Sequence, residues 1–415
     1  MMRLSGPASG AMLDALCGAR RRPRARLASL RQLRDDEGEV LDQALVLWFP
    51  GPASYTGEDC AELHLHGGHA VVEGVAERLG ALGGRPAEPG EFTRRAFLNG
   101  RMDLTEAEAV ADLVEAESSA QRRQALRQLD GSLGRLYGGW SERLKRITAH
   151  QEALIDFPDE DLPPEVEAGV IGAIEQLRAE IAAHLHDDRR GERVRRGLVV
   201  AVTGLPNVGK SSLINALAGR EVAIVSPAPG TTRDPIEVRV VFGGVAVTLV
   251  DTAGLRATED PVEAEGVRRA LARVREADLV IEVCDATAPS RGDEISAAPI
   301  VRVANKADLP ATAWSGDGIA TSLLTGEGLD ALRRRLDAEV RRMTGEAGPP
   351  PLTRARHRVA MASALEHLDG AADARLPELR AEGLRLALGS IGRATGAVGV
   401  EDLLDLVFGQ FCIGK

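Results

Sequence analysis

Four short motifs, in a fixed order between residues 204 and 308, constrain the fold of this chain more than any other feature. The first, GLPNVGKS at residues 204–211, matches the phosphate-binding loop of nucleotide-binding proteins and follows an apolar run at residues 198–203. In such a loop, glycines let backbone N–H groups surround a phosphate, Lys210 reaches the β- and γ-phosphates, and Ser211 offers its hydroxyl to Mg²⁺. The motif therefore predicts a strand, a phosphate-binding loop and a helix in succession.

The other three motifs identify the nucleotide. GTTRD at residues 230–234 lies where a switch loop would bring a threonine hydroxyl to Mg²⁺, and DTAG at 251–254 supplies an acidic residue on the Mg²⁺ side. In NKAD at residues 305–308, the Asp308 carboxylate can accept both N–H donors of guanine, a pairing that adenine does not offer. Asp251 and Asp308 taken singly could be turn residues, but the four motifs together predict a GTP-binding domain. The predicted nucleotide-binding residues are Asn207, Val208, Gly209, Lys210, Ser211, Ser212, Ser226, Pro227, Ala228, Pro229, Gly230, Thr231, Thr232, Asp251, Thr252, Ala253, Gly254, Asn305, Lys306, Asp308 and Ser322.

The catalytic apparatus departs from the pattern of Ras-like proteins. Leu255 follows the DTAG motif where those proteins have the glutamine that orients the attacking water. Because leucine cannot hydrogen-bond to water, another group must do so, and Glu263 is a candidate; the alternative is a solvated carboxylate at a helix start. Asn207 could hold a monovalent cation beside the phosphates, in place of the positive charge of an arginine finger.

The chain is multidomain by its pattern of elements. Strand-like runs alternate with helix-like segments from residue 198 to 345, which predicts a parallel α/β sheet, and helical segments lie on both sides of it. Thr105 and Glu108 fit a capping box at the first of these helices. Because insertions are tolerated where chain ends lie close together, we expect a domain inserted into another. The expected parts are an N-terminal α+β domain (1–99), a discontinuous helical domain (100–195 and 346–415) and an inserted α/β P-loop G domain (196–345).

Composition excludes some classes of protein. No apolar run approaches the roughly 18 residues that span a bilayer, so we expect a cytoplasmic protein with no membrane partner. The four cysteines are scattered without metal-ligand spacing. A net charge of −11 argues against non-specific coating of nucleic acid, but it leaves open an RNA substrate recognised through a local basic patch.

Several further motifs carry a resemblance to a known family. The phosphate loop with Pro206-Asn207 and the GTTRD switch resemble those of the bacterial MnmE (TrmE) family of tRNA-modifying GTPases, part of the wider TrmE/Era/Der superfamily of GTPases. So do FPGP at 49–52, YTGED at 55–59, PGEFT at 89–93, RAFLNG at 95–100, IDFPDE at 155–160 and the terminal FCIGK at 411–415. The resemblance covers nearly the whole chain.

The resemblance implies a fold and an activity. Members have an N-terminal folate-binding domain that forms a homodimer, a discontinuous helical domain and an inserted G domain. With the flavoprotein MnmG (GidA), which carries FAD, they add an aminomethyl or carboxymethylaminomethyl group at C5 of the wobble uridine (U34) of certain tRNAs. The one-carbon unit comes from a tetrahydrofolate derivative (5-formyl or methylene), and K⁺-dependent pairing of G domains activates hydrolysis of GTP to GDP.

Carried over position by position, the resemblance assigns roles to particular residues. Glu263 matches the catalytic glutamate, acting with Asn207 and Lys210. Cys412 matches a family cysteine to which we assign no chemical role. The implied ligand sets are Ser211 and Thr232 for Mg²⁺; Asn207, Ser226, Ala228 and Thr231 for K⁺; and Arg3, Glu62, Arg101 and Lys415 for folate.

The chain departs from the family pattern in three places. Its start is shorter than that of a typical member, which implies loss of the usual first strand and its glycine-rich loop and leaves Arg3 poorly anchored. Arg101 stands where the family usually has lysine. Ser322-Leu323-Leu324 replaces the usual Ser-Ala-Lys or Ser-Ala-Arg, so we expect weaker packing on the base.

Two alternatives remain at this point. A ribosome-assembly GTPase of the Era or Der type shares the phosphate loop, but carries a basic RNA-binding domain after its G domain. A paralogue that has lost folate chemistry through the shorter N-terminus is the second.

Overall fold

The computed structural model describes residues 1–18, 22–156, 164–220, 237–251, 275–287, 298–309, 318–345, 350–399, 401–409 and 411. These residues divide into two compact units, which are described separately. The first unit comprises Met1–Ala111, Gln128–Arg146 and Arg385–Lys415, and the second comprises Asp112–Arg127 and Ile147–Leu384.

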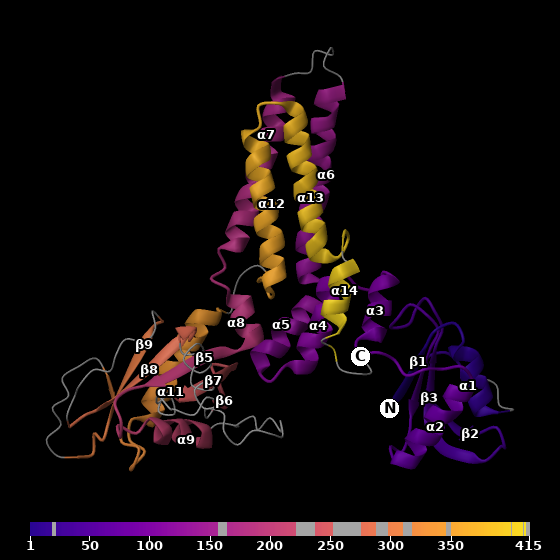
Figure 1. Cartoon of the computed structure of the whole chain (residues 1–415), viewed down its shortest axis with the longest axis horizontal. Helices are drawn as coiled ribbons and strands as arrows, with labels where there is room; N and C mark the ends of the chain where they lie inside the picture. Colours follow the sequence, from indigo (N-terminus) through magenta and orange to yellow (C-terminus); the bar gives the residue numbers. More distant parts are fainter. Residues whose placement is uncertain are drawn as a thin grey trace, which may run out of the picture. The chain divides into compact units, whose positions relative to one another are not determined.

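The first unit begins with a four-stranded antiparallel sheet in the order β1-β4-β3-β2 (Figure 1). Alternate residues of β3, among them Val46 and Trp48, are buried against helices α1 and α2, because successive side chains of a strand point to opposite faces. The predicted α+β character of this region is confirmed. The elements are β1 Met2–Ser5, α1 Ser9–Cys17, β2 Ser29–Arg34, β3 Val40–Phe49, β4 Cys60–His64 and α2 His69–Ala81.

Helices complete the first unit. Helix α14 (Glu401–Phe408) packs on α3 (Glu91–Leu98), where the rings of Phe97 and Phe408 lie 6.5 Å apart. Gly90, just before α3, has a φ of 69°, and a Cβ there would lie 2.8 Å from the Phe408 carbonyl oxygen, so only glycine allows this close approach. The C-terminal part of the chain therefore packs on the PGEFT segment.

The capping box of α4 (Leu104–Glu115) lies two residues before the predicted one. The Glu106 N–H donates to Asp103 Oδ1 at 2.8 Å, and the Asp103 N–H donates to Glu106 Oε2 at 2.8 Å. Thr105 and Glu108 are both buried inside the helix. The predicted capping box at Thr105 and Glu108 is wrong, because α4 already begins at Leu104 and the Asp103 carboxylate, one residue earlier, accepts the free Glu106 N–H.

The second unit holds a six-stranded sheet in the order β10-β9-β8-β5-β7-β6. Strands β5 (Leu198–Thr203), β7 (Val245–Asp251), β8 (Leu279–Asp285) and β9 (Ile300–Asn305) run parallel, as predicted, and so does the short β10 (Ile319–Ala320). One edge of the sheet departs from the predicted parallel pattern, since β6 (Glu237–Phe242) pairs antiparallel with β7. Helices α9 (Lys210–Arg220) and α11 (Leu329–Thr344) share the sheet's main hydrophobic core.

In the helical part of the second unit, an arginine of α12 holds the turn that leads into the sheet. Helix α12 (Ala355–Asp373) packs along α7 (Pro164–Leu185), as Figure 1 shows, and α8 (Arg190–Arg196) leads into β5. Arg358 of α12 donates to Asp187 at 2.7 Å and to Glu192 at 2.8 Å, which fixes the turn between α7 and α8. The remaining helices are α5 (Ser119–Leu129), α6 (Ser132–Asp156) and α13 (Pro377–Thr395).

Two further features are absent from the described residues. None of their helices combines the length and the apolar character needed to cross a bilayer. No group of three or more His, Cys, Asp or Glu side chains in the described ranges is arranged to hold a metal ion.

Candidate GTPase site

The described residues of three predicted nucleotide motifs meet at one edge of the second unit's sheet. The phosphate loop follows β5, Asp251 ends β7, Asp285 ends β8 and Asn305 ends β9. Because these four strands run parallel, their carboxyl ends lie at the same edge, which is where ligands bind in open α/β sheets. Segments that lie far apart in the sequence are thus brought to one site.

The phosphate loop depends on two glycines and one left-handed asparagine. Gly204 has a φ of 138°, and a Cβ there would lie 2.2 Å from the Val283 carbonyl oxygen. Gly209 has a φ of 106°, and Asn207 adopts a φ of 64°. The Lys210 ammonium, buried in the loop, donates to the carbonyl oxygens of Gly204 and Leu205 at 2.9 and 2.8 Å. The loop is therefore folded around the lysine that would meet a phosphate.

The predicted Mg²⁺ side of the site is also assembled. The Ser211 hydroxyl, at the first turn of α9, donates to Asp251 Oδ2 at 2.5 Å. Mg²⁺ prefers oxygen ligands and retains several waters, so a hydroxyl and a carboxylate side by side suit this ion. The hydroxyl of Ser211 and the carboxylate of Asp251 are a donor set that fits Mg²⁺.

Asn305 connects the guanine motif to the phosphate loop. Its buried amide Nδ2 donates to the Val208 carbonyl oxygen at 2.7 Å, and its Oδ1 accepts the Leu323 N–H at 3.2 Å. The Ser322 hydroxyl is fully buried and accepts the Thr325 N–H at 3.1 Å, so it closes the turn. The Asp308 carboxylate, by contrast, is exposed. The phosphate loop, the base motif and the turn at residues 322–325 therefore form one connected structure.

Asp285 is a site residue that the sequence analysis missed. Its Oδ2 lies 2.5 Å from Lys306 Nζ, and its Oδ1 accepts the hydroxyl and the N–H of Thr287 at 2.6 and 3.0 Å. The hydrogen bond from Lys306, followed by that from Thr287, lowers the pKa of the Asp285 carboxyl to about 2. The available signal was its position, since an acidic residue directly after the strand-like run at 279–283 must reach the same edge of the sheet.

A second constellation lies in the first unit. Arg3 of β1 stands opposite Glu62 of β4 in register, and its Nε and Nη2 donate to Glu62 Oε1 at 3.1 and 2.8 Å. The Arg3 guanidinium also lies 5.2 Å from the ring centre of Tyr55 and 5.6 Å from that of Phe92. The expectation that Arg3 is poorly anchored is wrong, because strand pairing, an ion pair and two aromatic rings hold it.

Arg101 lies beside the same loop. A Cβ on Gly57 would be 3.2 Å from Arg101 Cγ, and the neighbouring Asn99 donates to the Thr56 carbonyl oxygen at 2.7 Å. The Arg101 side chain is exposed. Three of the four predicted folate residues thus lie in the first unit around the loop that carries Tyr55.

Comparison with models of protein families identifies the family to which this chain belongs. The model of the MnmE helical domain matches residues 104–412, and the model of the GTP-binding protein TrmE N-terminus matches residues 1–101. This chain belongs to the MnmE family. It is therefore a GTP hydrolase, and the match along almost its full length excludes the Era or Der alternative.

Curated relatives of this MnmE family member cover the entire chain. The tRNA modification GTPase MnmE of Gluconacetobacter diazotrophicus is 60% identical, with 100% of this chain and 95% of the relative covered. That of Granulibacter bethesdensis is 55% identical, with 100% and 96% covered. The human mitochondrial 5-taurinomethyluridine-[tRNA] synthase subunit GTPB3 is 48% identical, with 100% and 90% covered.

Some residues predicted for the MnmE-type site lie outside the described residues. They include the catalytic candidate Glu263, most of the predicted K⁺ ligands, the second Mg²⁺ ligand and the two C-terminal positions. These residues are Ser226, Pro227, Ala228, Pro229, Gly230, Thr231, Thr232, Thr252, Ala253, Gly254, Glu263, Cys412 and Lys415.

Proposed function

We propose that this MnmE-family GTPase is K⁺-dependent and modifies C5 of the wobble uridine of certain tRNAs together with the FAD-carrying flavoprotein MnmG. The group added is aminomethyl or carboxymethylaminomethyl, and a tetrahydrofolate derivative supplies its one-carbon unit. The protein works as a cytoplasmic homodimer. The observation that carries the GTPase part is the assembly of Lys210, Ser211, Asp251 and Asn305 at one edge of the sheet.

The described residues suit a mechanism in which the enzyme positions GTP and stabilises the negative charge of the transition state. Lys210 lies inside the phosphate loop, where its charge would offset that which develops on the β- and γ-phosphate oxygens. Ser211 and Asp251 would hold Mg²⁺, which supplies further charge stabilisation when bound. The exposed Asp308 carboxylate is available to accept the two guanine N–H donors.

Asn207 is the described residue of the proposed K⁺ site. Asn207 is part of the phosphate loop, where its backbone is left-handed. It is therefore next to the N–H groups that would surround the phosphates. A monovalent cation there supplies the positive charge that an arginine finger provides elsewhere, and such a finger is worth about 10³ to 10⁵ in rate. Neutral oxygen ligands such as the Asn207 amide suit K⁺.

The Arg3–Glu62 pair is the proposed centre of folate binding. Glu62 Oε1 accepts both hydrogen bonds from Arg3, and its Oε2, with His64 Nε2 at 3.8 Å, would receive the N–H groups of a pterin ring. The rings of Tyr55 and Phe92 provide flat apolar surface nearby, and Arg101 provides a cation for a glutamate carboxylate. These residues fit a ligand that has a polar flat ring and an acidic tail.

Binding of 5-formyltetrahydrofolate to the purified chain tests the folate part. Arg3→Ala should weaken binding at least tenfold and leave GTP affinity unchanged, because Arg3 lies in the other compact unit from the GTPase site. Arg24→Ala, an exposed arginine of the same unit, is the matched control. Absence of folate binding by the unaltered chain would favour the alternative of a paralogue without folate chemistry.

A further inference from the structure

The turn between α7 and α8 lines a cavity rich in arginine. Its volume is about 470 Å³, and its lining includes the side chains of Arg189, Arg190, Arg193 and Arg342 together with Asp188 and Asp278. Arg342 comes from the last turn of α11, Arg189 immediately precedes α8, and Arg190 and Arg193 lie within α8. Four guanidinium groups therefore face two carboxylates, in a protein whose net charge is −11.

One of the two carboxylates in this lining, Asp278, is already engaged, and the other, Asp188, is exposed. Asp278 is buried, and its carboxylate accepts Arg193 Nε at 3.3 Å, Arg196 Nη2 at 2.6 Å and the Val199 N–H at 3.0 Å. It therefore orients two guanidinium groups. Arg190 donates to a neutral partner, the Asp187 carbonyl oxygen, at 3.0 Å.

The two outermost arginines keep their charge available to a ligand. Among the described residues, none pairs with the exposed Arg189 side chain. Arg342 is 62% exposed and its ion pair with Glu339 stays on its own helix. Asp188 and Arg189 both adopt left-handed backbone, with φ of 52° and 56°. This conformation is rare for residues other than glycine, and it turns the chain at the rim of the cavity.

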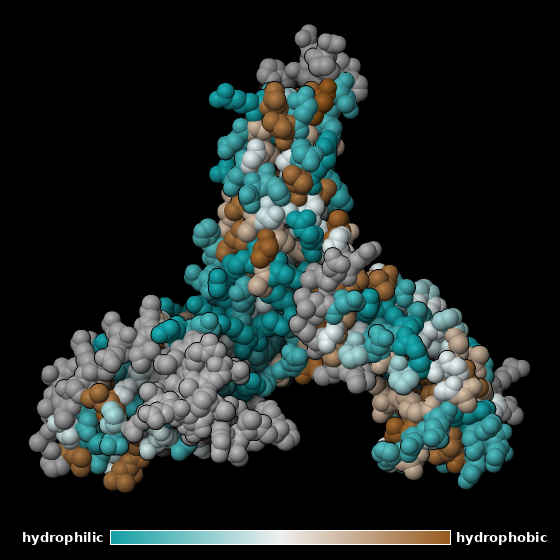
Figure 2. Space-filling view, viewed as in Figure 1, coloured by the Kyte–Doolittle hydropathy of each residue, from teal (hydrophilic) through white to brown (hydrophobic). Residues whose placement is uncertain are grey.

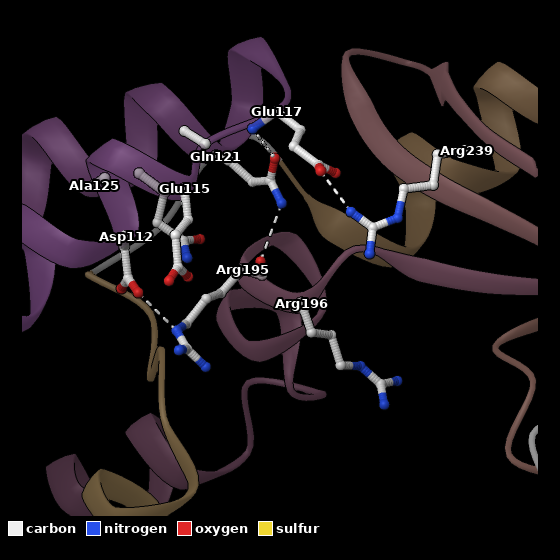
Figure 3. Close-up of a pocket in the computed structure, with 10 residues that line it drawn as sticks. Asp112, Glu115, Glu117, Gln121, Ala125, Arg195, Arg196 and Arg239 are labelled. Carbon is white, nitrogen blue, oxygen red and sulfur yellow. Dashed lines mark hydrogen bonds and ion pairs between the residues drawn. The ribbon is translucent and has the colours of Figure 1, made fainter. Parts of the chain in front are cut away.

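A neighbouring charged cavity differs from the arginine cavity, because most of its charged groups pair with one another. It has a volume of about 410 Å³ and holds three arginines and three acidic residues (Figure 3). Arg195 pairs with Asp112 at 2.8 Å and Arg239 with Glu117 at 2.5 Å. The Gln121 amide accepts the Glu117 N–H and donates to the Arg195 carbonyl oxygen, both at 3.0 Å. Four of its six charged groups pair with one another and Arg196 pairs with Asp278, so this cavity offers little to a ligand.

We propose that the arginine cavity, formed by Arg189, Arg190, Arg193 and Arg342, binds the phosphate backbone of the tRNA substrate. The proposal rests on the proposed function, which requires a tRNA partner. A guanidinium group presents paired donors that match phosphate oxygens, and the chain places several of them within one cavity.

The lining also distinguishes a nucleic acid from a protein partner. Its described apolar members are Pro299 and Met343, and no described residue of the lining is aromatic. Protein interfaces depend on buried apolar or aromatic anchors, whereas nucleic-acid interfaces are polar and positively charged. Figure 2 shows a densely hydrophilic surface at the place where Figure 1 labels α8. Because no ring is offered for base stacking, the contact is to the backbone and is independent of sequence.

The test is tRNA binding by the full chain, measured by fluorescence anisotropy over a range of salt concentrations. Arg189→Ala with Arg342→Ala should weaken binding about tenfold at 100 mM salt and reduce the salt slope by about 2, because each substitution removes one arginine–phosphate pair. Arg123→Ala with Arg127→Ala, two exposed arginines of α5, is the matched control and should change neither. GTP hydrolysis without tRNA should equal that of the unaltered protein in both variants.

Each other outcome overturns the proposal in a recognisable way. Equal tRNA affinity and salt slope in the cavity variant and the unaltered chain would exclude this cavity while leaving the proposed function intact. Equal competition by inorganic phosphate and by tRNA, at equal phosphate concentration, would make it a site for small anions. Loss of MnmG binding with unchanged tRNA binding would make it a protein interface. Absence of any tRNA binding by the unaltered chain would overturn it, and wobble-uridine analysis of a deletion strain would then judge the proposed function separately.

Discussion

Replacing Gly209 by alanine should damage the phosphate side and the guanine side of the site together. At a φ of 106°, an added Cβ would lie 2.5 Å from Asn305 Nδ2 and 3.1 Å from Leu323 Cδ1. Asn305 must then move, and its movement breaks the bonds to the Val208 carbonyl oxygen and the Leu323 N–H. One methyl group thus disturbs the loop, the base motif and the turn that follows β10.

The expected magnitude follows from these contacts. Backbone strain at a non-glycine residue of this conformation costs roughly 1 to 3 kcal/mol. The two hydrogen bonds of Asn305 contribute about 0.5 to 1.5 kcal/mol each. The sum is about 2 to 6 kcal/mol, and 1.4 kcal/mol corresponds to a factor of ten. We expect Gly209→Ala to lose at least about 30-fold in affinity for GDP and GTP.

The assay is titration with a fluorescent GDP analogue, with thermal unfolding measured in parallel to detect any cost paid before nucleotide binds. Gly219→Ala in α9 is the matched control, because a Cβ there meets nothing within 4 Å. Alanine should stabilise that helix by up to about 1 kcal/mol and leave affinity unchanged. A Gly209→Ala protein within threefold of the unaltered affinity, with an unchanged unfolding temperature, would refute the coupling through Asn305.

Four further outcomes are expected. GTP hydrolysis should be faster in K⁺ than in Na⁺, and Asn207→Ala should abolish the difference with nucleotide affinity nearly intact; equal rates in both salts would contradict a K⁺ site. Glu263→Ala should lower kcat by about 10²- to 10⁴-fold with little change in GTP binding. A single-turnover rate within threefold of that of the unaltered enzyme would show that Glu263 has no catalytic role. Asp308→Asn should prefer XTP, because an amide can pair with xanthine, and a retained GTP preference would show that the base motif is misassigned. The lowered pKa of the Asp285 carboxyl gives stability that is complete above its usual pKa of 3.8 and is lost as the pH falls toward 2; Asp285→Asn should remove about 1 kcal/mol near pH 6, since the pair with Lys306 is partly exposed, and unfolding curves that coincide at pH 6 would exclude this contribution.

The sequence predicted the parallel strands and the phosphate loop well because local pattern decides them. Each of the four strands is a short apolar run, and three of them are followed by a nucleotide-binding motif or end in its first residue. Strand β6 was missed, since Glu237 and Arg239 interrupt its apolar residues and an edge strand needs no continuous apolar run. The capping box was misplaced because two pairs near the start of α4, Asp103 with Glu106 and Thr105 with Glu108, both have the spacing of a capping box.

The local sequence pattern does not predict contacts between segments that lie far apart in the chain. The pairs Lys306–Asp285 and Arg3–Glu62 are separated by 21 and 59 positions, so their geometry depends on sheet register. The arginine cavity likewise combines residues near position 190 with Arg342. The RRGERVRR run is visible in the sequence, but only the packing of α8 and α11 shows which of its guanidinium groups remain available.

The central claim is that GTP hydrolysis by this chain supports modification of the wobble uridine, and mass spectrometry of tRNA nucleosides tests it most directly. Cells that lack the protein should lose the C5 aminomethyl-type and carboxymethylaminomethyl-type wobble uridines. The unaltered gene should restore them, and a Lys210→Ala gene, which removes the charge from the phosphate loop, should not. Unchanged wobble nucleosides in the deletion strain, or full restoration by Lys210→Ala, would contradict the account.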